Sequence, residues 1–117
     1  FYPSPDECLK EIRFIRGEVI SSVRSGDVEH AKFWVPQWDE WTRRMEVGAF
    51  LRRGKVTPYQ RMQGFLLRQK LDVLEHELEH EDLPFSTRSR LAVELTLTDS
   101  RFVRAYRQPY VPGEISD

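Results

Sequence analysis

The sequence has little of several features that define familiar classes of protein. Its 117 residues include one cysteine, Cys8, so no disulfide can form within the chain and packing alone must hold the core. A lone thiol suits a reducing, intracellular compartment. No apolar run is longer than three residues, which predicts neither a membrane-spanning helix nor the core of a signal peptide.

Motifs for catalysis are also scarce. The glycines are isolated, so there is no glycine-rich phosphate loop, and neither Cys8 nor any serine lies in a recognisable nucleophile motif. Residues 76–80 read HELEH, which matches the His-Glu-x-x-His string of zinc proteases. However, every second residue from Glu75 to Glu81 is glutamate, and a catalytic zinc site also needs a third ligand and a desolvated setting. We therefore predict a non-enzymatic protein with no catalytic residue, metal, cofactor or small-molecule substrate.

Two segments carry strong signals for the start of a helix. Ser4-Pro5-Asp6-Glu7 combines a capping serine, a proline at the first helical position and a glutamate three residues after the cap. Apolar residues then recur every three or four positions as far as Gly26, which predicts a helix over about 5–24. Thr57-Pro58-Tyr59-Gln60 repeats the signal and predicts a long helix over 58–82.

The segments around Pro36 and Leu91 are less regular. Proline disfavours a helical conformation at the preceding residue and lacks an amide donor, so we expect a short helix from Asp27 to about Trp34 and a separate helix over 36–53. Residues 91–98 alternate between apolar and polar, as a strand would, but the chain offers no strand to pair with. We favour a helix there, broken near Asp99.

These elements predict an all-α fold, a compact bundle of four to five helices. Its centre is an antiparallel helical hairpin formed by about 36–53 and 58–82. We interpret residues 1–117 as a single helical domain cut from a longer protein, with 109–117 as an extended tail. The predicted core residues are Leu9, Ile12, Ile15, Val19, Val23, Trp41, Met45, Met62, Leu66, Leu67, Leu71, Leu74, Leu91, Leu95 and Phe102.

The net charge is only −1, but the charges are sorted along the chain. Residues 43–70 contain eight basic residues and one acid, whereas residues 72–82 contain six acids and no basic residue. Acids at the C-terminal end of a helix oppose the helix dipole, so we expect Arg88, Arg90 or a partner's arginine close to them. Alternating blocks of charge favour a domain that pairs with itself or with another protein chain.

The densest aromatic stretch contains Trp34, Trp38 and Trp41. Two interpretations are open: these rings belong to the core, or they form a groove that takes up a partner. We predict that Trp41 is buried in register with Met45, and that Trp34 and Trp38 are exposed at the bend that Pro36 imposes. Together with Arg43 and Arg44, Trp34 and Trp38 are the predicted partner-binding residues.

The function predicted from these patterns is a non-catalytic protein–protein interaction or self-association module of a larger intracellular regulatory or scaffold protein. The alternative is a nucleic-acid-binding helical domain that uses the basic 43–70 segment, with Arg52, Arg53 and Lys55 as the contact point. The overall charge of −1 and the expected pairing of these cations with acidic blocks make the alternative weaker.

Overall fold

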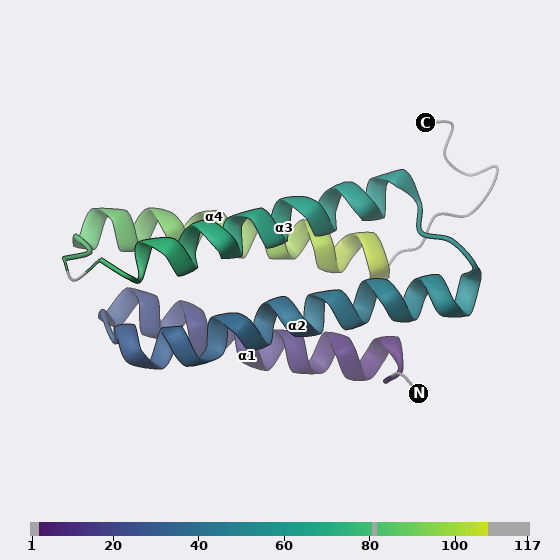
Figure 1. The fold of residues 1–117 in the computed structure, drawn as a ribbon, viewed down its shortest axis with the longest axis horizontal. Coiled ribbons are helices and arrows are strands. Elements are labelled where there is room, and N and C mark those ends of the chain that lie inside the picture. Colours follow the sequence, from purple (N-terminus) through teal and green to yellow (C-terminus); the bar gives the residue numbers. More distant parts are fainter. Residues whose placement is uncertain (1–2, 81, 108–117) are drawn as a thin grey trace.

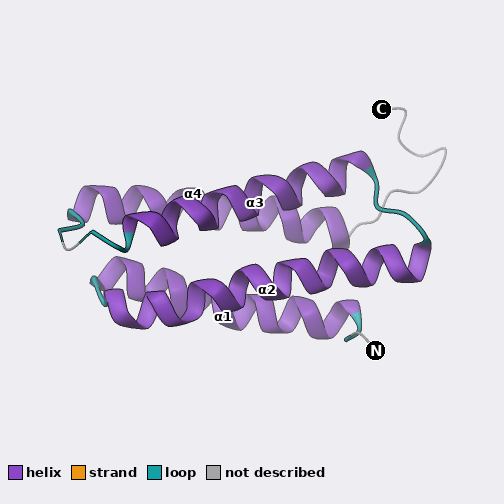
Figure 2. Cartoon of the chain, viewed as in Figure 1, coloured by secondary structure: helices purple, strands orange, loops and turns teal. Residues whose placement is uncertain are grey.

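The fold is all-helical, as predicted, in a computed structural model that describes residues 3–80 and 82–107. Its helices are α1 (Pro5–Ser25), α2 (Val28–Arg53), α3 (Pro58–Glu77) and α4 (Phe85–Arg107), and no strand occurs in these residues. Figure 1 shows two antiparallel pairs, α1 with α2 and α3 with α4, stacked on one another. Each helix packs against two neighbours, and only short turns separate the helices (Figure 2).

The predicted caps are present and explain where α1 and α3 begin. The Ser4 hydroxyl accepts a hydrogen bond from the Glu7 amide at 3.2 Å, and Glu7 Oε1 accepts one from the Ser4 amide at 2.9 Å. Thr57 and Gln60 form the same reciprocal pair at the start of α3. Each cap contributes about 1 kcal/mol, because it satisfies amides that have no partner within the helix.

The predicted helix break at Pro36 is wrong, since α2 runs without interruption from Val28 to Arg53. Pro36 lies on the exposed side of α2, where water can reach the carbonyl that its missing N–H leaves without a partner. On the opposite side Ala31, Val35 and Trp38 are buried. Two of these buried residues precede Pro36 in the sequence and one follows it. Their burial offsets the roughly 3 kcal/mol that proline costs inside a helix.

Two other boundaries differ from the sequence prediction. Helix α4 is continuous, so the strand interpretation of 91–98 and the break near Asp99 are both wrong. The Thr98 hydroxyl donates to the Glu94 carbonyl at 2.7 Å, which ties this residue into the helix. Helix α3 ends at Glu77 instead of 82, with Leu78 as its C-terminal cap. The predicted tail over 109–117 lies outside the described residues.

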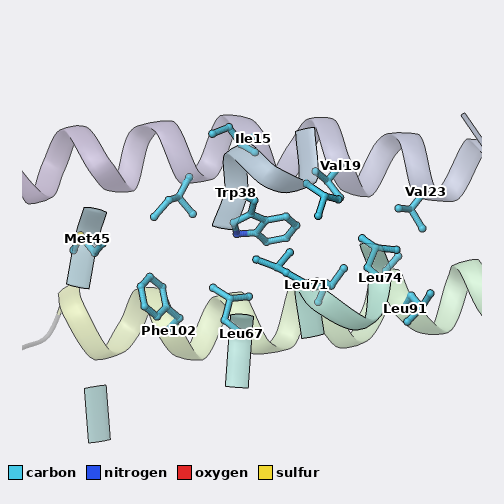
Figure 3. Packing of buried hydrophobic residues seen from close by; sticks show 14 of the residues in the cluster. Ile15, Val19, Val23, Trp38, Met45, Leu67, Leu71, Leu74, Leu91 and Phe102 are labelled. Atoms are coloured by element: carbon cyan, nitrogen blue, oxygen red, sulfur yellow. The ribbon is translucent and has the colours of Figure 1, made fainter. Parts of the chain in front are cut away.

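Apolar residues from all four helices form one core cluster (Figure 3). Most predicted core residues are buried, but Met62 is 53% exposed, and Leu9, Leu66 and Trp41 are only partly buried. Helix α3 has two apolar stripes, and the one that faces inward passes through Leu67, Leu71, Leu74 and Leu78. The stripe that contains Met62 therefore lies on the outer side of α3.

Candidate partner-binding surface

Trp38 is a core residue, so the prediction that its ring is exposed is wrong. Its side chain is 0% exposed and lies between Ile15 and Val19 of α1 and Leu71 of α3 (Figure 3). The indole Nε1 donates a hydrogen bond to Asp99 Oδ1 of α4 at 3.1 Å. A buried indole needs an acceptor for its N–H, and Asp99 supplies one.

Asp99 is itself buried and links three helices. Its Oδ2 accepts a hydrogen bond from Arg16 Nη1 of α1 at 2.8 Å, while Oδ1 binds Trp38 of α2. Burial raises the pKa of the Asp99 carboxyl, and the bonds from Arg16 and Trp38 offset only part of this effect. Both donors therefore favour the ionised carboxylate, while burial disfavours it.

Trp34 lies on the surface formed by α1 and α2. Its ring packs edge-on against Phe14 of α1, with centroids 5.6 Å apart, and against Phe33 of α2 at 5.1 Å. Phe14 is 55% exposed and Phe33 is 62% exposed. Beside them, His30 Nε2 lies 2.7 Å from Glu18 Oε1, which joins the same two helices.

Trp41 continues this surface two helical turns further along α2. Its ring is only half-buried, so the prediction that it is the inward member of the three tryptophans is wrong. The Arg44 guanidinium lies 4.7 Å above the Trp41 ring and also bonds Glu40 at 3.1 Å. A guanidinium over an aromatic face is an attractive cation–π contact. We call Phe14, Phe33, Trp34, Trp41 and Arg44 the aromatic surface.

The four predicted partner-binding residues do not stay together. Trp34 and Arg44 lie on the aromatic surface and Trp38 lies in the core. Arg43 bonds Asp39 at 3.0 Å and lines a groove between α2 and α3, where Phe65 is a neighbour. Phe14 and Phe33 were missed by the sequence prediction. The available signal for Phe14 was its position off the apolar stripe of the first helix, which leaves a large ring with no place in the core.

Most basic residues of the 43–70 segment bind groups of the chain itself. Arg43 and Arg44 pair with acids four residues earlier, Arg68 pairs with Glu46, and Lys70 Nζ lies 3.5 Å from Glu94 Oε1. The predicted contact point is Arg52, Arg53 and Lys55. Arg52 Nη1 donates to the Pro3 carbonyl at 3.3 Å, Lys55 is exposed, and the Arg53 side chain lies outside the described part of the structure.

The HELEH string spans the end of α3. His76 lies in the last turn of the helix and His80 lies beyond it, with the two rings 6.2 Å apart. Within residues 3–80 and 82–107, no group of three or more His, Cys, Asp or Glu side chains is placed to hold a metal ion.

The expected partners of the acidic segment 72–82 are engaged elsewhere. Arg88 lies over the Phe85 ring at 5.5 Å, and Arg90 Nη1 lies 3.6 Å from Glu94 Oε2. No ion pair among the described residues joins Arg88 or Arg90 to this segment. Both arginines contact residues of their own helix, so the predicted pairing is not seen with the described acids of this segment.

Comparisons with models of protein families, with curated proteins and with solved structures find no significant match to this chain. Among the described helices, none has the length and apolar character needed to cross a membrane.

Proposed function

We propose that this chain is a non-catalytic protein-interaction module of a larger intracellular regulatory or scaffold protein, and that it binds another protein chain, or a second copy of itself, through the aromatic surface. The observation that carries this proposal is the cluster of Phe14, Phe33 and Trp34, whose rings contact one another while two of them remain more than half exposed. Exposed apolar clusters of this kind mark interaction sites more often than isolated apolar residues do.

The composition of the aromatic surface supports binding to a protein. Tryptophan and arginine are the residues that most often dominate interface energy, and the surface has Trp34 and Trp41 with Arg44. The polar residues Glu18, His30 and Glu40 border the rings, as the polar rim of an interface does. Edge-on packing also fixes the rings before binding, which lowers the entropy that association costs.

We further propose that the helices form a four-helix bundle, with α2 and α3 as its central antiparallel hairpin. Gly54, in a left-handed conformation at φ 82°, ends α2, and the Thr57 cap starts α3 three residues later. Such a bundle would hold α1 and α2 rigid and keep the aromatic surface in shape.

Affinity capture followed by mass spectrometry tests the proposal, with sedimentation velocity to detect self-association. The double substitution Phe14→Ala and Trp34→Ala should abolish capture or self-association, because it removes two central rings. The control Tyr59→Ala with Phe65→Ala removes two exposed aromatic rings from α3 instead and should change neither. Equal binding by both double variants would refute the assignment of the aromatic surface.

The second candidate function, nucleic-acid binding through the 43–70 segment, has weaker support. Its exposed cations Lys55 and Arg61 have no ion pair among the described residues, whereas Arg43, Arg44, Arg68 and Lys70 do. Titration with duplex DNA at low salt separates the two candidates. Micromolar affinity that falls steeply with salt would favour nucleic-acid binding.

A further inference from the structure

We propose that the groove between α1 and α4 binds a compact ligand that carries two or more phosphate groups. The groove has a volume of about 440 Å³ and is lined mainly by arginine. We call it the arginine groove. Its lining residues are Leu9, Arg13, Arg16, Ser100, Val103, Arg104 and Arg107.

The arginines converge because of their spacing on two packed helices. Arg13 and Arg16 are three residues apart on α1, and Arg104 and Arg107 are three residues apart on α4. Residues at this spacing lie on the same face of a helix. The N-terminal half of α1 and the C-terminal half of α4 lie at the same end of the molecule, where the two helices pack together (Figure 1). Two pairs of guanidinium groups therefore line one groove.

The positive charge of the arginine groove is only weakly opposed by acids. Among the ion pairs of the described residues, none includes Arg13, Arg104 or Arg107, whereas Arg43, Arg44, Arg68 and Arg90 each have a carboxylate partner. Among the described residues, the carboxylates close to the groove are the buried Asp99, which faces Arg16, and Asp6, which lies at the end next to Lys10. An anionic ligand would relieve the repulsion between the guanidinium groups.

The buried Asp99 side chain holds the Arg16 guanidinium in place at the base of the arginine groove. Arg16 Nη1 donates to Asp99 Oδ2 at 2.8 Å, and the Asp99 side chain is fully buried, while the Arg16 side chain remains 30% exposed and lines the groove. A guanidinium has five N–H donors in a fixed plane. The bond to Asp99 orients that plane and leaves other donors for a ligand. Planar pairs of N–H groups match the oxygens of phosphate.

The lining favours a compact phosphate ligand over single-stranded nucleic acid. Proteins that bind single strands combine basic residues with aromatic rings on which the bases stack, and none of the residues that line the arginine groove is aromatic. Its volume lies within the usual range for small-molecule sites. Two or more phosphates are needed to reach both arginine pairs, and the Ser100 hydroxyl offers a further donor.

Isothermal titration of the chain with inorganic tripolyphosphate, at an ionic strength of about 0.15 M that screens nonspecific attraction, tests this proposal. We expect one saturable site per chain. The double substitution Arg13→Gln with Arg104→Gln removes one exposed guanidinium from each helix. It should weaken binding by about tenfold or more, as the loss of charge-assisted hydrogen bonds does. The control Lys55→Gln with Arg61→Gln removes the same charge from an exposed region elsewhere and should leave affinity within about twofold.

Three outcomes would overturn the proposal. The first is the absence of saturable binding. The second is an equal loss of affinity in both double variants, which would indicate attraction to net charge instead of a site. The third is tighter binding of an oligothymidylate than of tripolyphosphate, lost in the Arg13/Arg104 variant, because the ligand would then be nucleic acid. All four substituted residues are exposed, so we expect both variants to retain their helices, and circular dichroism checks this.

Discussion

Replacement of Trp38 by alanine should destabilise the protein far more than the same change at Trp34 or Trp41. Trp38 is 0% exposed, and truncation of a fully buried tryptophan costs about 3–5 kcal/mol. The change also removes the indole N–H from Asp99 Oδ1, and a buried acceptor that loses its partner adds about 1–3 kcal/mol. Trp34 and Trp41 are only half-buried and, within the described part of the chain, donate no hydrogen bond to a buried group, so we expect about 1–2 kcal/mol for each.

Urea unfolding followed by circular dichroism measures these differences as shifts in the midpoint at constant slope. The expected loss at Trp38 is comparable to the whole stability of many small domains, so this variant should be partly unfolded in buffer. Trp38→Phe serves as a milder control, because it keeps a six-membered aromatic ring and removes the donor to Asp99 together with a small part of the indole. It should cost about 1–3 kcal/mol. If Trp38→Ala costs no more than Trp34→Ala, the buried position of Trp38 and its bond to Asp99 are refuted.

Three further predictions follow from individual contacts. Burial raises the pKa of Asp99 in the folded protein above its value in the unfolded chain. Between these two pKa values, the folded state binds more protons than the unfolded state. Ionisation of Asp99 therefore lowers the free energy of unfolding as pH rises from about 4. The unfolding free energy of the parent, minus that of Asp99→Asn, should therefore fall as pH rises from about 4, and a rise in that difference would contradict the assignment. Pro36→Ala restores an amide inside α2 but also frees the unfolded chain, so it should raise the urea midpoint by an amount equivalent to about 2 kcal/mol, whereas a loss of stability would indicate that α2 needs the proline. His76→Ala should leave thermal stability within about 0.5 kcal/mol, as expected at an exposed position, and elemental analysis should find no stoichiometric zinc.

Features set by neighbours in the chain were predicted best. The Ser4 and Thr57 caps, the ends at Gly26 and Gly54 and the inward stripe of α1 all depend on contacts within about four residues. Such contacts follow from helix geometry alone. The arginine groove and the Asp99 site depend instead on how α1, α2 and α4 pack together. Asp99 lies 83 residues from Arg16 and 61 from Trp38, and nothing in the sequence near any of them indicates the others.

The error at Pro36 also explains the error at the tryptophans. A helix that starts at Pro36 has Trp38 and Trp41 at the beginning of its apolar stripe, and the position of Trp41 four residues before Met45 then predicts that Trp41 faces inward. In the continuous α2, the inward stripe begins upstream and crosses the proline. It contains Ala31, Val35, Trp38, Thr42, Met45 and Ala49, all buried.

Spacings of four, three, four, three and four residues keep that stripe on one face of a helix. Trp34 and Trp41 are displaced from it, so that Trp34 packs against Phe14 of α1 and Trp41 lies under Arg44 of α2. The rule that proline disfavours a helix interior is correct about the missing hydrogen bond. It leaves out the free energy gained by burying apolar side chains on the other face of the helix. Because Pro36 faces water, the lost bond is a modest cost against the burial of an entire stripe. The apolar stripe that crosses Pro36, and not the proline itself, therefore places Trp38 in the core and leaves Trp34 and Trp41 only partly buried.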